Sequence, residues 1–485
     1  MESESIKKSL FSGLIWTSGG QFLTVIVNLS INIVLAKFLS PDQFGVMGII
    51  MFFVLLGDVL AKGGLSGALI RMEKVNPLDY STVFVFNLIV STILYIILWI
   101  SSEEISIYYG HNEIEILLRI TGLTLIVNAF QLINITNLVR SWKFKERFIF
   151  EFSSTLIASI ISVVLALNDF GIWALALLPL NTSLFLTIFL ILSEGFHGGY
   201  MFSFKSFKKT YKFGVNTTLA SLIETTFENI YSLVLGRYFS VTQVGYFYQA
   251  QKLQKVPNNI LNSFSQRVLF PVLSKSQNNK LEFSRVYNKI NILFTVFVGL
   301  FGLFIFIFSK PIILLLFGSK WLGSVFYLQL FIVASFFYMQ EQFNRIIFKV
   351  FDKTSNILVL EIIKKVFQII TIIFGVYYLN IKYLIFGYVL TSVFSFFINF
   401  SRSRKIINSD FFGEIAIVLK IFICGLVCVF INNFCLTIFE FKYLIYFLFP
   451  FLILLYFAFL NILNVCNISD LKNILNFLNL KKIIK

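Results

Sequence analysis

Long apolar runs recur from one end of this chain to the other, each about 18–25 residues in length. An α-helix of that length crosses a hydrocarbon layer of about 30 Å. The chain of 485 residues is 58% hydrophobic and only 13% charged, which is more apolar surface than a soluble fold can cover. Helices satisfy their own backbone hydrogen bonds within a bilayer. The sequence therefore predicts an all-α polytopic membrane protein.

We predict fourteen membrane spans, numbered here in chain order. Lys7 and Lys8 precede an apolar stretch that runs to Ala36. This stretch is too long for a cleavable signal peptide and lacks a small-residue cleavage site, so we expect span 1 to be retained. The predicted spans are 14–36, 45–67, 79–100, 114–138, 150–168, 171–193, 214–235, 245–268, 286–308, 324–347, 355–378, 383–400, 414–435 and 443–466.

Basic residues concentrate on one side of these spans. The richer side holds both termini and every second connection, including 140–147, 205–212 and 402–405. The poorer side holds Lys37, Arg237, Lys310, Lys320, Lys382 and Lys442. Because Lys and Arg stay in the cytoplasm, both termini are predicted to be cytoplasmic. The net charge of +16 then reflects topology and attraction to anionic lipids, and we expect no nucleic acid partner.

The sequence offers little support for an enzyme. The connections between spans are short, so we expect the spans and loops themselves to carry the function. There is no GxxxxGK[ST] phosphate loop and no HExxH motif, and the two histidines, His111 and His197, lie in predicted connections. We expect no catalytic residue, no metal site and no bound cofactor.

Two polar turns lie two hundred residues apart and share a pattern. FLSPDQFG at 38–45 and YFSVTQVG at 238–245 have Ser, Gln and Gly at matched positions, each after a basic residue. YYGHNE at 108–113 similarly matches LFGSKW at 316–321. Six spans separate the first two copies, so both have the same orientation in the membrane. The sequence predicts two parallel repeats around a cleft, as in transporters built from such repeats.

Spans 1 and 7 each carry a polar stripe at helical spacing. The stripes are Thr17, Gln21, Thr24, Asn28 and Asn32 in span 1, and Thr217, Ser221, Glu224, Glu228 and Ser232 in span 7. Since polar side chains avoid lipid, both stripes should face protein or water. Hydrogen bonding between helices and the lining of a cavity remain open for the neutral residues. For Glu224 and Glu228 we favour a cavity.

Basic residues also fall inside the predicted spans, where each costs about 2.5–3.5 kcal/mol at a helix centre. They are Lys62, Arg119, Lys252, Lys255, Lys289, Arg345, Lys364, Lys365 and Lys420. Some lie near span ends and can extend their ammonium or guanidinium groups to the surface. Lys252 and Lys255 lie deeper in span 8, on the face of Asn259 and Asn262. Arg345 lies one turn from Glu341 and is expected to pair with it.

The excess of intramembrane cations favours an anionic substrate, because Lys and Arg bind phosphate by charge and geometry. Three acidic groups, Asp58, Glu224 and Glu228, are candidates for ion coupling by H⁺ or Na⁺. With Gln21 and Asn28 they form the predicted polar lining of the cavity.

The assembled motifs resemble the polysaccharide transporters of the multidrug/oligosaccharidyl-lipid/polysaccharide exporter superfamily, the Wzx-type flippases. The resemblance rests on four segments: FLSPDQFG, GGLSGALIR at 63–71, VGYFYQAQKLQKVPNNILNSFSQRVLFPVLSK at 244–275, and LFGSKW. VFDKTSN at 350–356 departs from the pattern, since it lacks the Gly-basic pair expected there.

The resemblance implies an N-lobe at 1–200, a C-lobe at 201–405, and two accessory spans with a cytoplasmic tail at 406–485. It implies a substrate, an oligosaccharide unit on undecaprenyl pyrophosphate, for O-antigen, capsule or exopolysaccharide. It also implies a bacterial inner membrane and contact with polysaccharide assembly machinery. Within this frame the residues predicted to hold the pyrophosphate are Lys252, Lys255, Arg345, Lys62 and Arg119.

Three other functions stay open on the sequence. A multidrug or cation exporter of the same superfamily fits the repeat but not the excess of cations. A lipid II flippase has similar chemistry. A membrane-embedded polysaccharide polymerase would need a long outer loop, and the predicted outer loops are short.

Overall fold

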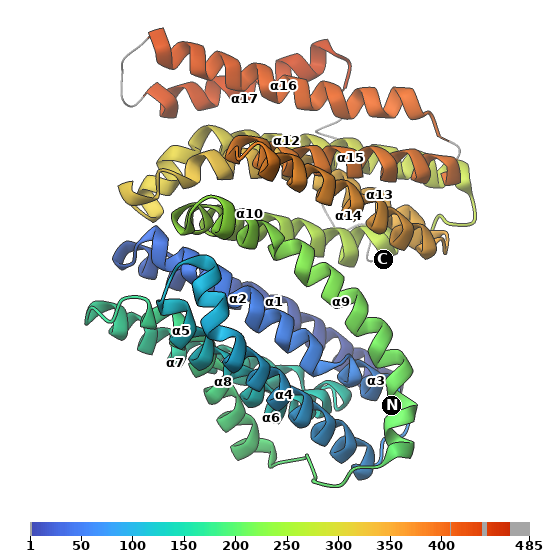
Figure 1. The fold of residues 1–485 in the computed structure, drawn as a ribbon. Coiled ribbons are helices and arrows are strands. Elements are labelled where there is room, and N and C mark those ends of the chain that lie inside the picture. The colour runs from blue at the N-terminus through green and yellow to red at the C-terminus, as the bar shows by residue number, and fades with distance from the viewer. Residues whose placement is uncertain (1, 408, 439–443, 466–485) are drawn as a thin grey trace. The chain divides into compact units, whose positions relative to one another are not determined.

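The computed structural model describes residues 2–407, 409–438 and 444–465. Over these residues the chain is built from helices and contains no strand (Figure 1). Each of the fourteen predicted spans lies mainly on helical residues, although span 2 crosses a turn at Gly63 and Gly64, and residues 443 and 466 of span 14 lie outside the described residues. The prediction of an all-α polytopic protein is confirmed.

Within the described residues, eight helical segments are long and apolar enough to cross a membrane. The number fourteen therefore stays a prediction. The eight segments are Pro41–Lys62, Pro77–Tyr109, Glu113–Arg140, Phe144–Leu167, Trp173–Glu194, Lys280–Leu316, Ile381–Ile407 and Phe411–Ile438.

The chain divides into two compact units. The first comprises residues 1–249 and 316–321, and the second comprises 250–315 and 322–485, so the division falls within helix α10. The predicted lobes instead divide at residue 200, where the repeat begins again. That boundary stays a prediction.

The first unit contains helices α1 to α9, the start of α10 and the short helix η2. Within it α4 lies beside α6, and α7 packs on α8 (Figure 1). Its helices are α1 (Glu2–Phe38), α2 (Pro41–Lys62), α3 (Leu65–Arg71), α4 (Pro77–Tyr109), α5 (Glu113–Gly122), α6 (Thr124–Arg140), α7 (Phe144–Leu167), α8 (Trp173–Glu194), α9 (Phe204–Tyr238), α10 (Val241–Phe264) and η2 (Ser319–Trp321).

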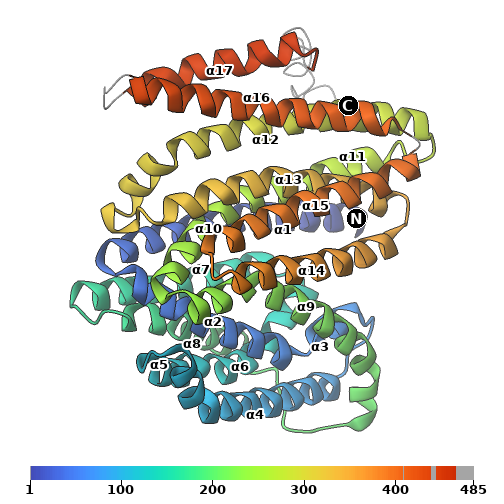
Figure 2. The same ribbon diagram turned by 45° about the horizontal axis from the view of Figure 1, so that its top comes forward.

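The second unit has its core among the long helices α12, α13, α15, α16 and α17. Figure 2 shows α16 and α17 running side by side, and α13 beside α15. Its remaining elements are η1 (Ser265–Leu269), α11 (Phe270–Ser274), α12 (Lys280–Leu316), α13 (Ser324–Val350), α14 (Thr354–Tyr377), α15 (Ile381–Ile407), α16 (Phe411–Ile438) and α17 (Leu444–Ile462).

Local chemistry explains the boundaries of α2. Ser40 and Gln43 form a capping box: the Ser40 amide donates to Gln43 Oε1 at 2.9 Å, and the Gln43 amide donates to Ser40 Oγ at 3.4 Å. Pro41 occupies the first turn, where no backbone donor is needed. Gly63, at φ +54°, ends the helix in the left-handed region that glycine tolerates best. The Ser-x-x-Gln of the first repeat is thus a helix start.

The second copy begins its helix similarly. The amide of Gln243 donates to Ser240 Oγ at 3.3 Å, just before the first turn of α10. The shared Ser and Gln of the two turns therefore have a common structural role, to start α2 and α10.

Candidate functional site

The two repeated turns meet in the first unit. A Cβ on Gly45 would overlap the backbone carbonyl of Val241, and one on Gly245 would overlap that of Pro41. These four positions form two pairs related by the offset of two hundred residues. The Thr242 hydroxyl also donates to the Asp42 carboxylate, its counterpart in the first copy. The shared glycines are explained by this reciprocal approach, which leaves no room for a side chain.

The second pair of matched segments contacts the turns crosswise. Trp321, from LFGSKW, is fully buried, and its indole Nε1 donates to the carbonyl of Ala36 at 2.8 Å. Lys320 Nζ donates to the carbonyl of Lys37 at 2.8 Å, and burial lowers the pKa of Lys320. Thus residues 316–321, from the second half of the chain, hydrogen-bond to the residues just before the 38–45 turn of the first half.

The opposite pairing is also present. Arg237, which precedes the second turn, donates to the carbonyl of Tyr108 at 2.6 Å and lies 4.2 Å from the centroid of the Tyr108 ring. Tyr108 belongs to YYGHNE in the first half. The four matched segments therefore form one pseudo-symmetric cluster, which we call the corner cluster: residues 37–45, 108–110, 237–245 and 316–321.

A polar network surrounds Asp58 within the first unit. Asp58 on α2 pairs with Lys62 one turn later, with 2.6 Å between Oδ2 and Nζ. Its other oxygen accepts from Asn128 Nδ2 on α6 at 2.9 Å. Ser183 on α8 donates to Asn128 Oδ1 at 2.6 Å, and Gln131 donates to Ser183 Oγ at 2.7 Å. The network thus connects α2 to α6 and α8.

Two of the predicted pyrophosphate ligands in the first unit have protein partners. Lys62 is held by Asp58, and Arg119 pairs with Glu115 at 2.8 Å. The Nε of Arg119 also donates to Ser102 Oγ at 2.8 Å, and its guanidinium lies 4.8 Å from the Trp99 ring centroid on α4. The remaining predicted residues of this unit are mostly on surfaces: Asn28, Glu224 and Glu228 are exposed, and the side chain of Gln21 lies outside the described residues.

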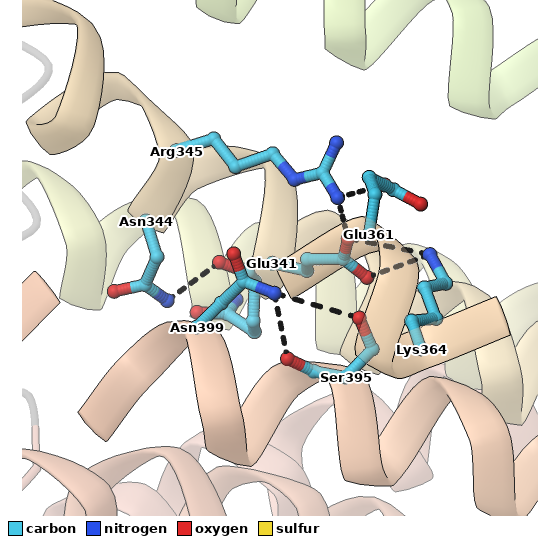
Figure 3. Close-up of polar contacts among 8 residues, drawn as sticks. Glu341, Asn344, Arg345, Glu361, Lys364, Ser395 and Asn399 are labelled. Carbon is cyan, nitrogen blue, oxygen red and sulfur yellow. Dashed lines mark hydrogen bonds and ion pairs between the residues drawn. The ribbon is translucent and has the colours of Figure 1, made fainter. Parts of the chain in front are cut away.

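A buried ionic network lies in the second unit between α13 and α14 (Figure 3). The Glu341 side chain is 0% exposed and accepts from Arg345 at 2.5 Å and from Lys364 at 3.1 Å. Arg345 also pairs with Glu361 on α14. Two carboxylates thus balance two cations. Arg345 Nε is buried and has no hydrogen-bond partner among the described residues.

Lys252 and Lys255 lie on α10, in the second unit. Lys252 is half-buried and Lys255 is exposed. Between them Gln254 points to α13, where its Nε2 donates to Ser335 Oγ at 2.7 Å. The helix therefore packs through Gln254 and presents Lys255 outward.

Sequence reasoning missed several members of these networks. Asn128 and Ser183 are neutral residues in apolar runs, and nothing in their local sequence indicates that they reach Asp58. Glu361 lies close to Lys364 and Lys365 in the sequence, but its ion pair with Arg345 requires α13 and α14 to be adjacent.

The fold is that of a polytopic helical membrane protein. It matches a solved structure of lipid II flippase MurJ in an inward closed conformation, with a TM-score of 0.71 and 22% identity over 92% of this chain and 98% of that one. It also matches an inward-facing multidrug resistance MATE family transporter of the MOP superfamily, with a TM-score of 0.59 and 17% identity over 82% and 98%.

Residues 34–326 match the family described as polysaccharide biosynthesis protein, and the chain belongs to that family. The predicted resemblance to polysaccharide transporters is thereby confirmed.

Three bacterial relatives carry names that refer to polysaccharide biosynthesis, in agreement with this family. One is the succinoglycan biosynthesis transport protein ExoT of Rhizobium meliloti (strain 1021), 26% identical over 63% of this chain and 60% of its own length. Another is the lipopolysaccharide biosynthesis protein WzxC of Escherichia coli (strain K12), 24% identical over 68% of each chain. A third is the teichuronic acid biosynthesis protein TuaB of Bacillus subtilis (strain 168), 22% identical over 66% and 67%. The match thus spans three fifths to about two thirds of these relatives.

Proposed function

We propose that this protein moves an oligosaccharide repeat unit, linked to undecaprenyl pyrophosphate, across the cytoplasmic membrane of a bacterium. The observation that carries the proposal is membership of the polysaccharide biosynthesis family by a chain with a transporter fold. The products are O-antigen, capsule or exopolysaccharide units, in agreement with the names of the relatives. The termini lie in the cytoplasm, as the distribution of basic residues predicts.

Binding of the carrier would rest on cations. Lys252 and Lys255 of α10 hold the pyrophosphate, and Arg345 contributes through the charge of its guanidinium. Because Glu341 and Glu361 already neutralise Arg345, we assign the larger share of the attraction to the two lysines. Lys62 and Arg119 play a lesser part, since each is held by a carboxylate one turn away.

Alternating access would depend on the corner cluster. Its reciprocal glycine contacts and its hydrogen bonds between the matched segments hold these segments together at one end of the first unit. We place this end on the periplasmic side. Release of the oligosaccharide requires these contacts to separate, and their pseudo-symmetry lets both halves open together.

Ion coupling is assigned to the Asp58 network. Asp58 combines a carboxylate with an amide from α6, so binding or loss of H⁺ or Na⁺ there changes contacts between α2 and α6. Glu224 and Glu228 remain further candidates on α9. The protein is not an enzyme and uses no resident cofactor, and its further partners are the proteins that assemble the polysaccharide.

The test uses cells that lack their own exporter and depend on this protein. Lys252→Ala with Lys255→Ala should abolish surface polysaccharide while membrane insertion and protein amount stay normal. The matched control is Lys289→Ala, an exposed lysine at the start of α12. Normal polysaccharide in the double variant would remove the assigned binding site.

The same cells separate the alternatives. Rescue of a strain that lacks its lipid II flippase would identify peptidoglycan precursor as the substrate. Drug resistance without surface polysaccharide would identify a multidrug exporter. The proposal predicts neither result.

A further inference from the structure

A cavity of about 200 Å³, lined by both polar and apolar side chains, lies in the second unit between α12 and α16. It is separate from the ionic network of Figure 3, which joins α13 to α14. Helix α16 belongs to the two accessory spans and has no counterpart in the predicted repeats. The described residues that line the cavity are Asn288, Asn291, Ile292, Thr295, Glu414, Ile417 and Val418.

Glu414 supplies the negative charge of this cavity. Its Oε1 accepts from Asn288 Nδ2 at 2.7 Å, and its Oε2 lies 2.5 Å from Arg404 Nε. Arg404 is 2% exposed, and its guanidinium lies 4.1 Å from the ring centroid of Phe400 and 4.9 Å from that of Tyr287. The carboxylate is therefore balanced by a fixed cation. The charge of the cluster is zero before anything binds.

Two carbonyl oxygens at the cavity remain without a protein donor. They are Oδ1 of Asn288 and Oδ1 of Asn291. Asn291 is 4% exposed, so its amide is almost fully removed from solvent. Thr295 is already satisfied, since its hydroxyl donates to the backbone carbonyl of Asn291 at 2.6 Å and accepts from Gln340 Nε2 at 2.9 Å. A buried acceptor without a donor is destabilising, so the site favours an occupant that interacts with oxygen lone pairs.

We propose that this cavity binds a monovalent alkali cation, with Asn288 Oδ1, Asn291 Oδ1 and the Glu414 carboxylate as ligands. Hard cations prefer carbonyl and carboxylate oxygens, and the cavity is large enough for the ion to keep water ligands as well. The lining contains one carboxylate, which Arg404 already balances. A divalent ion would add two uncompensated charges in a buried place, whereas a monovalent ion adds one.

The position of the ligands indicates what the ion does. Asn288 and Asn291 lie on α12, and Glu414 lies at the start of α16. The bound ion joins the accessory helix to the core of the second unit. This site does not depend on the identity of the transported substrate, and it is distinct from the coupling role assigned to Asp58.

The experiment measures thermal unfolding of the purified full-length protein in detergent, in NaCl, KCl and choline chloride at equal ionic strength. The proposal predicts a saturable rise of the unfolding midpoint with Na⁺ or K⁺ relative to choline, and the more effective salt identifies the preferred ion. Asn291→Ala should raise the half-saturating concentration about tenfold or more. Asn291→Asp, which adds a negative charge, should lower it.

The matched control is Asn432→Ala. Asn432 is also buried on α16 with an unpartnered Oδ1, but it does not line the cavity, so this variant should keep the wild-type response. Equal midpoints in all three salts would overturn the proposal, as would an unchanged salt response in Asn291→Ala. If Asn291→Ala fails to fold, Asn291→Ser and the wild-type comparison with choline provide the same decision.

Discussion

Removing the charge of Glu341 should strongly destabilise the second unit. Glu341 is fully buried and contacts two cations, Arg345 at 2.5 Å and Lys364 at 3.1 Å. In Glu341→Gln the side chain keeps nearly the same volume, but Arg345 and Lys364 are left with Glu361 as the one carboxylate of the network. Breaking a buried pair on one side costs about 3–5 kcal/mol, because a charge stays buried without compensation. We therefore expect Glu341→Gln to lower the free energy of unfolding by about 3–5 kcal/mol.

A second substitution that restores the charge balance of the network tests whether the uncompensated charge causes this loss of stability. In Glu341→Gln with Lys364→Met, one charge of each sign is gone and Arg345 keeps Glu361 as its partner. The double variant should therefore lose less stability than the sum of the two single variants. The assay is reversible unfolding by denaturant in mixed micelles, followed by tryptophan fluorescence. Glu104→Gln, at an exposed position of α4, is the control.

Two results would refute this reasoning. A loss below about 1 kcal/mol in Glu341→Gln would mean that water screens the network as it screens surface ion pairs. Strict additivity in the double variant would mean that the two side chains do not share one charge balance.

Three further predictions concern the first unit. Gly45→Ala and Gly245→Ala should each lower the unfolding midpoint, since a Cβ would overlap a backbone carbonyl. The control Gly425→Ala, with open space around its Cβ position, should not lower it. Equal midpoints for all three variants would contradict the reciprocal contact. Trp321→Phe should cost about 1–3 kcal/mol in free energy of unfolding, because it leaves the buried Ala36 carbonyl without its donor; no loss would mean that water replaces the indole. Asp58→Asn should remove the dependence of transport on an H⁺ or Na⁺ gradient in membrane vesicles while leaving protein amount normal, and an unchanged dependence would exclude Asp58 from coupling.

Much of the fold could be predicted from sequence because helix formation in a membrane is local. Each predicted span lies mainly on helical residues, and the Ser40–Gln43 capping box is visible as a four-residue pattern. The repeat of this pattern at Ser240 was also visible. The structural role of the repeat could not be predicted, because the close approach of Gly45 to Val241 depends on how α2 packs against the start of α10.

The candidate sites were predicted less completely, because their contacts depend on how separate helices pack and not on local sequence alone. Pairs one helical turn apart, such as Asp58 with Lys62 and Glu341 with Arg345, follow from spacing alone. Partners on other helices do not, and Arg404 illustrates the difference. The sequence placed Arg404 in a cytoplasmic connection after a span ending at residue 400. Helix α15 instead continues to Ile407 and buries Arg404 against Glu414.

The central claim is translocation of a lipid-linked oligosaccharide, and it can be measured directly. The purified protein is reconstituted into vesicles that contain a fluorescent oligosaccharide on undecaprenyl pyrophosphate, and a glycosidase added outside reports how much of the sugar becomes accessible with time. We predict that wild-type protein exposes the sugar initially protected in the inner leaflet, and that Lys252→Ala with Lys255→Ala does not. Identical protection in protein-containing and empty vesicles would contradict the account.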